Sequence, residues 1–217
     1  MNDELKNELD LDNFRKFFIE FTIKAFELLP GIDNPDILDI GCGSGVPTIK
    51  LAELSRGNII AIDIDQKLLD KLRRKIEKYN LTDRIKVKKG SMNELDFLNK
   101  RFDIIWAEGS IAVIGFKEGI KKWKHFLKNK GFLVIHDDAG NVRKKIELIK
   151  DYDYRLIAHF VISKETWMKE YYYPVEEHLK KLNKKYNNKR QIETALNRIQ
   201  REINMVNDSV FLVMQKR

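Results

Sequence analysis

The sequence predicts an α/β protein built on a doubly wound, mostly parallel sheet of seven strands. Short apolar runs typical of buried strands alternate with helical segments along residues 35–162, and a glycine-rich turn follows the first of these runs. The segment 163–207 breaks the alternation and has a helical pattern, and a strand-like segment follows it. We therefore expect a helical insertion between the last two strands.

The expected elements follow one another in a regular order. Residues 14–29 carry apolar side chains at mostly helical spacing, and Pro30-Gly31 ends that helix. The expected strands span residues 37–40, 58–62, 85–89, 102–106, 131–135, 154–162 and 209–215. The expected helices between them span residues 46–54, 66–79, 119–127 and 142–150. The predicted domains are an N-terminal helical segment (1–34), an α/β domain (35–162), a helical cap (163–207) and the final strand (208–217).

Composition sets limits on the class of protein. The 217 residues suit one domain, or one domain with an insertion, and 43% of them are hydrophobic, which is enough for a full core. The net charge of +8 suits nucleic acid or an anionic membrane, but acidic residues are interleaved with the basic ones, which favours solvated helix faces. Cys42 is the only cysteine, so an internal disulfide and a cysteine-based zinc site are excluded. We see no signal peptide and no membrane span, and expect a cytoplasmic protein.

The glycine-rich turn, Asp39-Ile40-Gly41-Cys42-Gly43-Ser44-Gly45, lies between the first strand and the next helix. Glycine permits positive φ angles and a close approach of the backbone to a ligand, and the N-terminus of the following helix attracts negative groups. The spacing departs from the dinucleotide fingerprint G-x-G-x-x-G, because Val46 stands where the third glycine belongs. No Gly-Lys-Ser/Thr of a phosphate-binding loop follows either. A plain tight turn is the alternative.

The pattern Asp39-x-Gly41-x-Gly43-x-Gly45 resembles the first motif of class I S-adenosylmethionine-dependent methyltransferases. The resemblance implies a Rossmann-like methyltransferase fold, S-adenosylmethionine as the cofactor and transfer of its methyl group to an acceptor. In that family the loop wraps the methionine part of the cofactor, and the leading acid helps to hold its amino group. The positions that carry over are Asp39, Gly41, Cys42, Gly43 and Gly45.

Asp63 ends the second strand, 20 residues after Gly43. A carboxylate at this place can accept hydrogen bonds from both hydroxyls of a ribose, and the family has its ribose-binding acid here. We assign Asp63 and its neighbour Ile64 to the cofactor site. Asp65 is the alternative ribose ligand, although we favour it as the cap of the following helix.

The third strand leads into Gly90-Ser91-Met92, where many family members carry Gly-Asp-Ala. The usual acid, which holds the adenine amino group, is therefore missing. A subgroup of small-molecule methyltransferases, resembling enzymes of ubiquinone biosynthesis, has Gly-Ser-Met. We expect backbone and hydroxyl contacts from Ser91 and packing of Met92 on the adenine ring. A simple loop and helix cap is the alternative.

Glu108 and His136 lie where the fourth and fifth strands end. Ligands of open α/β sheets bind at the carboxyl ends of the strands, so both face the expected reaction site, and Glu108 is also a candidate cofactor contact. A hydroxyl or ammonium acceptor needs a base, for which Glu108 is the first candidate and His136 the second. A thiol or a neutral amine needs neither. For Asp137 and Asp138 we weigh a polar substrate wall, helix capping and a metal site, and we predict no metal.

The helical cap contains Trp167, Tyr171 and Tyr172, in a stretch that resembles the Trp-x-x-x-Tyr-x-x-Pro of the same subgroup. The resemblance implies that these three side chains close over the acceptor and line its pocket. Packing within the protein core is the alternative.

The resemblance favours a small-molecule acceptor. An RNA methyltransferase suits the basic charge, but we see no separate RNA-binding module and no Asn/Asp-Pro-Pro-Tyr-like tetrapeptide. A cofactor-binding regulator without catalysis is the third alternative.

Overall fold

The computed structural model describes residues 9–95, 100–187 and 189–217. The chain forms two compact units. Of the described residues, those within 19–161 and 209–217 form an α/β unit, and those within 9–18 and 162–208 form a helical unit. Among the described residues, no helix is long and apolar enough to cross a membrane.

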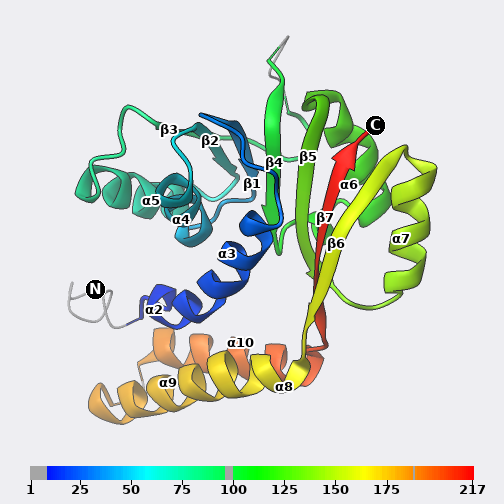
Figure 1. Cartoon of the computed structure of the whole chain (residues 1–217). Helices are drawn as coiled ribbons and strands as arrows, with labels where there is room; N and C mark the ends of the chain where they lie inside the picture. Colours follow the sequence, from blue (N-terminus) through cyan, green and yellow to red (C-terminus); the bar gives the residue numbers. More distant parts are fainter. Residues whose placement is uncertain (1–8, 96–99, 188) are drawn as a thin grey trace. The chain divides into compact units, whose positions relative to one another are not determined.

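The α/β unit is built on a seven-stranded sheet with the order β3-β2-β1-β4-β5-β7-β6 (Figure 1). The strands are β1 (Asp36–Ile40), β2 (Asn58–Asp63), β3 (Ile85–Lys89), β4 (Phe102–Glu108), β5 (Leu127–Asp138), β6 (Tyr154–Ile162) and β7 (Ser209–Lys216). The pairs β1–β2, β2–β3, β1–β4 and β4–β5 are parallel, whereas β5–β7 is antiparallel. The predicted fold class is confirmed.

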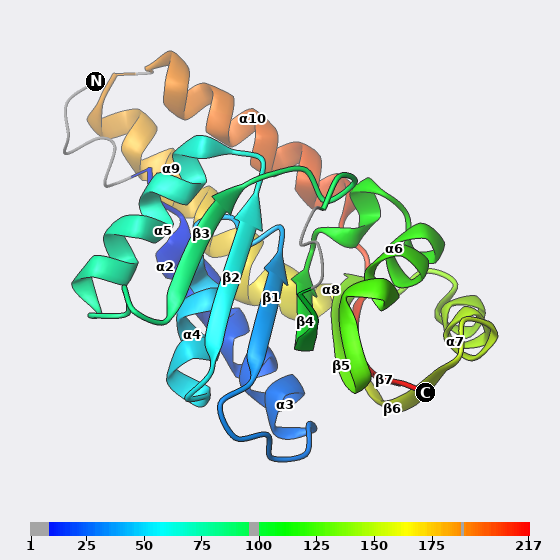
Figure 2. The same cartoon turned by 90° about the horizontal axis from the view of Figure 1, so that it is seen from above.

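Helices flank this sheet (Figure 2). They are α3 (Ile19–Glu27), α4 (Val46–Leu54), α5 (Gln66–Lys78), α6 (Phe116–Trp123) and α7 (Val142–Asp151), with short 3-10 helices η2 (Ile111–Val113) and η3 (Lys124–Phe126). Helices α4 and α5 contact β2, and α5 also contacts β3. Every helix predicted between two strands is present, with bounds that differ by a few residues.

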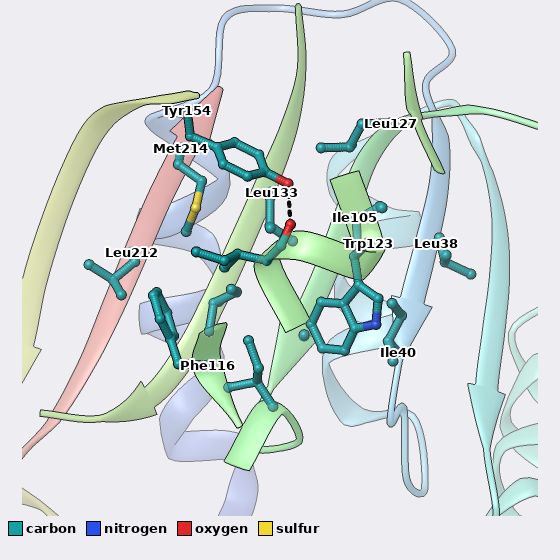
Figure 3. Packing of buried hydrophobic residues seen from close by; sticks show 14 of the residues in the cluster. Leu38, Ile40, Ile105, Phe116, Trp123, Leu127, Leu133, Tyr154, Leu212 and Met214 are labelled. Atoms are coloured by element: carbon teal, nitrogen blue, oxygen red, sulfur yellow. Dashed lines mark hydrogen bonds between the residues drawn. The ribbon is translucent and has the colours of Figure 1, made fainter. Parts of the chain in front are cut away.

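The hydrophobic core between the sheet and α6 explains why the central strands are almost wholly apolar. Leu38, Ile105 and Leu133, from three neighbouring strands, are fully buried against Trp123 of α6 (Figure 3). The Tyr154 hydroxyl at the start of β6 donates to the Ile120 carbonyl of α6 at 3.0 Å. Parallel strands are covered on both faces, so apolar residues are needed at consecutive positions.

Two boundaries differ from the prediction for identifiable reasons. The fifth strand, expected over residues 131–135, begins at Leu127, which already pairs with Phe102, and a register shift follows between Phe102 and Ile104. Lys130 adopts a φ of 60° in this irregular stretch. The single helix predicted over residues 14–29 is three segments, α2 (Asp12–Arg15), the 3-10 helix η1 (Lys16–Phe18) and α3.

The helical unit has its own core. Its elements are α2, η1, α8 (Lys164–Trp167), the π-helix η4 (Met168–Tyr172), α9 (Tyr173–Lys185) and α10 (Arg190–Met205). Val175, Leu179, Ile192 and Ile199 are fully buried, and Phe14 and Phe18 from the N-terminal residues pack against this cluster. The helices expected between the last two strands are therefore present.

Candidate cofactor and acceptor site

The glycine loop after β1 is held by backbone hydrogen bonds. The N–H groups of Gly41 and Cys42 both donate to the Ile62 carbonyl, at 2.8 and 3.0 Å, and the Gly45 N–H donates to the Cys42 carbonyl at 2.9 Å. Gly41, Gly43 and Gly45 have φ angles of 74°, 55° and 80°. Residues that carry a side chain rarely adopt such φ angles, which explains why glycine occupies all three positions.

The three glycines have different surroundings. A Cβ atom on Gly41 would lie 2.4 Å from Ser110 Cβ, and one on Gly45 would lie 2.2 Å from Leu72 Cδ1. A Cβ atom on Gly43 would meet nothing within 4 Å. Gly41 and Gly45 are therefore required for packing inside the protein, whereas Gly43 leaves open space at the loop where a ligand can approach the backbone.

Asp63 fixes the same loop from the end of β2. Its Oδ2 accepts from the Gly43 N–H at 2.8 Å, and its Oδ1 accepts from the Asp65 N–H at 2.8 Å. A carboxylate offers about four lone-pair sites, so each oxygen keeps capacity for one more donor. The predicted ribose ligand is thus held in one orientation by the backbone and can still receive two hydroxyl groups.

The neighbours of Asp63 have separate roles. Asp65 caps α5, because its side chain accepts from the Lys67 N–H at 2.8 Å, as favoured from the sequence. Ile64 is 70% exposed, so its side chain is accessible to an apolar part of a ligand.

Asp39 is buried beneath the loop. It is 2% exposed, and its Oδ2 accepts from the Thr48 hydroxyl of α4 at 2.6 Å. Burial raises the pKa of Asp39 to about 7, although the Thr48 hydrogen bond lowers it, and the charge of Asp63 raises it further. Burial, with the charges of Asp39 and Asp63, also raises the pKa of the Cys42 thiol, so this cysteine stays protonated. The site therefore holds negative charge that a cationic ligand would stabilise.

Ser91 and Met92 lie in the turn after β3. The Ser91 hydroxyl accepts from the Asn93 N–H at 3.2 Å within this turn. The Cε atom of Met92 lies 3.7 Å from the place of a Cβ atom on Gly41, so this side chain reaches the glycine loop. Met92 also lines a cavity of about 230 Å³ together with Trp123.

Glu108 ends β4 on the same side of the sheet as Asp39. Its Oε1 accepts two hydrogen bonds, from Trp106 Nε1 at 2.7 Å and from the Thr22 hydroxyl of α3 at 2.9 Å. Burial raises its pKa to about 7, the two hydrogen bonds lower it, and the Asp39 charge raises it. A carboxyl group with this pKa is suited to proton transfer near neutral pH.

His136 pairs in register with Glu108 across β4 and β5, so the two predicted catalytic residues lie side by side. Its Nε2 lies 2.9 Å from the Ser209 hydroxyl, and its ring stacks on Phe211 at 4.5 Å. Burial lowers the pKa of His136 to about 4. The imidazole is therefore neutral at neutral pH.

Asp137 and Asp138 are bound within the protein. Asp137 forms an ion pair with Lys145 of α7 at 2.6 Å, with both side chains largely buried. Asp138 Oδ1 accepts from the Gly140 N–H at 2.6 Å in the turn before α7. In the described part of the chain, no group of three or more acidic, histidine or cysteine side chains is arranged to hold a metal ion.

The predicted acceptor-pocket residues pack in the helical unit. Trp167 lies 3.9 Å from Phe18 between ring centroids, and Tyr171, which is 4% exposed, lies edge-on to both. Tyr172 contacts Trp167 and Tyr171 and is partly exposed. Burial, with the charge of Glu202, raises the pKa of Tyr172 to about 12. The π-helix places these tyrosines in one aromatic cluster.

Three polar residues of the site were not singled out from the sequence. Thr22 and Thr48 donate to the carboxylates of Glu108 and Asp39, and the Ser110 hydroxyl donates to the Ile40 carbonyl at 2.7 Å beside Gly41. Thr22 stands four residues from Phe18 and four from Phe26, on the apolar face of its helical segment. A hydroxyl on such a face is the signal that could have indicated a buried partner.

Comparison with known proteins gives a consistent result. Residues 37–131 match a methyltransferase domain. The chain is 29% identical over 114 residues to the ribosomal protein L11 methyltransferase of Alkaliphilus metalliredigens, covering 52% of this chain and 34% of that protein. It is 36% identical over 93 residues to the demethylmenaquinone methyltransferase of Lactobacillus johnsonii, covering 42% and 35%. The chain thus spans about a third of the length of these curated relatives.

Among solved structures, the fold resembles that of an S-adenosylmethionine-dependent methyltransferase from Geobacter sulfurreducens in complex with S-adenosyl-L-homocysteine. The TM-score is 0.75, the sequence identity is 12%, and the match covers 91% of each chain. This likeness concerns the fold. The methyltransferase-domain match covers residues 37–131 and includes the glycine loop after β1, so this part of the chain is similar to methyltransferases in sequence as well as in fold.

Proposed function

We propose that this protein uses S-adenosylmethionine to methylate a small-molecule acceptor, with Glu108 as the base. The observation that carries the proposal is the open backbone at Gly43, with the carboxylate of Asp63 bonded to it and the buried Asp39 below the loop. Bound against this loop, the cofactor supplies a methyl group on a positively charged sulfur atom.

The residues of the loop and its neighbours fit this cofactor. Asp63 would receive the ribose hydroxyls, and Asp39 would help to stabilise the amino group. The exposed Ile64 and the Met92 side chain, which reaches the loop, would pack on the adenine ring. Gly41, Cys42, Gly43 and Gly45 would form the cradle, and Ser91 would add a backbone contact.

On the acceptor side, the protein aligns the reactants and removes a proton. Alignment of acceptor, methyl and sulfur supplies much of the rate enhancement in such a displacement. Glu108 takes the proton of a hydroxyl or ammonium acceptor as the new bond forms. The neutral His136 beside it is the second candidate base, but its low pKa makes it the weaker one. Trp167, Tyr171 and Tyr172 as acceptor contacts and a cytoplasmic location stay predictions.

The acceptor class is supported by the demethylmenaquinone relative, whereas the name of the first relative indicates a protein acceptor. The experiment is incubation of the purified protein with methyl-labelled cofactor and a cell extract, which is then separated into metabolite, RNA and protein fractions. Label in the metabolite fraction is expected. Label in RNA or protein would overturn the small-molecule assignment, and cofactor binding without any transfer would favour a regulator.

The same labelling assay tests whether Glu108 acts as the base. We expect Glu108→Gln to abolish most transfer and to remove the acidic limb of the pH profile. Unchanged transfer at every pH would exclude Glu108 as the base.

A further inference from the structure

We infer that Thr22 and Trp106 are positioning residues, which fix Glu108 through its Oε1 atom and so present Oε2 as the atom that accepts the proton. The inference rests on the proposed function, in which Glu108 is the base. It assigns roles to two residues that do not themselves touch cofactor or acceptor.

The hydrogen bonds to Glu108 converge on one oxygen atom. Trp106 Nε1 and the Thr22 hydroxyl both donate to Oε1, at 2.7 and 2.9 Å. Within the described parts of the chain, Oε2 receives no hydrogen bond, and the Glu108 residue as a whole is partly exposed. One oxygen is therefore anchored, and the other keeps its lone pairs for a proton.

Both donors are themselves held in place. Trp106 is fully buried, with its ring 6.4 Å from the Phe26 ring of α3, and its backbone pairs in register with Asp39 on β1. Thr22 is 1% exposed and lies on α3, three residues before the fully buried Ala25. Neither donor can follow Glu108 into another rotamer without disturbing packed neighbours, so the pair restricts the carboxylate to one orientation.

The groups facing Glu108 set the direction of the expected effects. Thr22 and Trp106 stabilise the charged carboxylate and lower its pKa, whereas burial and the charge of Asp39 raise it. His136, its neighbour on β5, is neutral at neutral pH and adds no charge. Removal of either donor must therefore raise the Glu108 pKa above about 7.

The first experiment follows the Glu108 carboxyl group directly, by ¹³C NMR titration of the cofactor-free protein. The signal is assigned through its loss in Glu108→Gln. Thr22→Val keeps the shape of the side chain but removes the donor, and we expect the carboxyl titration to move up by about one pH unit. Trp106→Phe should move it in the same direction. Thr22→Ser, which restores the hydroxyl, should return it towards the wild-type position.

Thr48→Val is the matched control, because Thr48 donates to a different carboxylate, that of Asp39. Asp39 would then keep its proton to higher pH and repel Glu108 less. The Glu108 titration should therefore stay in place or move down, opposite to the effect of Thr22→Val. Thermal melting of each variant shows that it is folded.

The second experiment measures methyl transfer against pH with saturating cofactor. In Thr22→Val the acidic limb should move up with the NMR titration, with about tenfold lower rates below the inflection and a smaller loss on the alkaline plateau. An unmoved carboxyl titration in both Thr22→Val and Trp106→Phe would overturn the inference. A titration that moves while the pH profile does not would confirm the anchoring but exclude Glu108 as the base.

Discussion

At the scale of single residues, the neighbouring acids Asp63 and Asp65 have different roles. Asp63 accepts from two backbone N–H groups and keeps capacity for two further donors, whereas Asp65 closes the first turn of α5. The difference lies in position: Asp63 is the last residue of a strand, and Asp65 precedes a helix. The two carboxylates therefore offer a matched pair for mutation.

We predict that Asp63→Ala weakens cofactor binding about 10- to 100-fold, because hydrogen bonds to a charged group are lost. Asp65→Ala should leave cofactor binding within about threefold and lower the free energy of unfolding by about 1 kcal/mol, the cost of a lost helix cap. Calorimetric titration and thermal melting measure the two quantities. Equal loss of affinity in both variants would contradict the assignment of the ribose contact to Asp63.

The raised pKa of Asp39 predicts that the stability of the protein depends on pH. Its pKa is about 7 in the folded protein against an ordinary value of 3.8, so the folded carboxyl group keeps a proton that the unfolded chain has released. Between these values the folded state binds more protons, and this group therefore destabilises the protein as the pH rises from about 4 to about 7.

Asp39→Asn removes this titration. We predict that the cofactor-free variant gains stability relative to wild type between pH 5 and pH 8, by about 3 kcal/mol, and that the substitution weakens cofactor binding. Denaturant unfolding at both pH values measures the difference between the two proteins, which separates Asp39 from the other carboxyl groups. A pH-independent difference would show that Asp39 is charged in the folded protein throughout.

At the scale of elements, the glycine loop joins β1 to α4 and contacts α5. Gly45 cannot carry a side chain because Leu72 of α5 fills the adjoining space. Gly43 has no such neighbour, and we expect its missing side chain to leave room for the ligand. The loop thus has two glycines for folding, Gly41 and Gly45, and one for the ligand, Gly43.

We predict opposite outcomes for two substitutions in this loop. Gly45→Ala should lower the free energy of unfolding by about 2–5 kcal/mol, from backbone strain and the clash with Leu72. Gly43→Ala should lower the free energy of unfolding by only about 1–2 kcal/mol, because of the positive φ at this position. This variant should nevertheless lose most of its affinity for the cofactor. Urea unfolding and calorimetric titration test this pair. Full cofactor affinity in Gly43→Ala would show that the ligand does not approach the backbone there.

At the scale of the whole molecule, the chain folds as two compact units with separate cores. Leu179 is fully buried in the helical unit, and Leu69 of α5 is fully buried in the α/β unit. Phe14 and Phe18 contribute to the helical core, although they precede the α/β unit in the sequence.

We predict that Leu179→Ala reduces hydrogen-exchange protection in α9 and α10 much more than in β1 and β4, and that Leu69→Ala does the reverse. Each substitution removes a buried side chain, at a cost of about 2–5 kcal/mol in its own core. Hydrogen exchange measured by mass spectrometry on both variants reports the local stability of each unit. Equal losses throughout the chain would show one cooperative unit in place of two.

The sequence by itself determined the alternation of strands and helices of the α/β class, the glycine loop and the acids at strand ends. Consecutive buried positions require apolar runs, positive φ angles require glycine, and the carboxyl ends of parallel strands meet at one edge. These are local rules, so the place of Gly43, Asp63 and Glu108 could be predicted without coordinates.

The tertiary structure alone decided which partner each buried acid has. Thr22 is 86 residues from Glu108, and no pattern of spacing connects them. Only the packing of α3 brings that hydroxyl to the carboxylate, and burial is the largest cause of the shifted pKa values of Asp39, Glu108 and His136. Local rules fix backbone conformation, but desolvation and hydrogen bonding between distant residues depend on the folded chain as a whole.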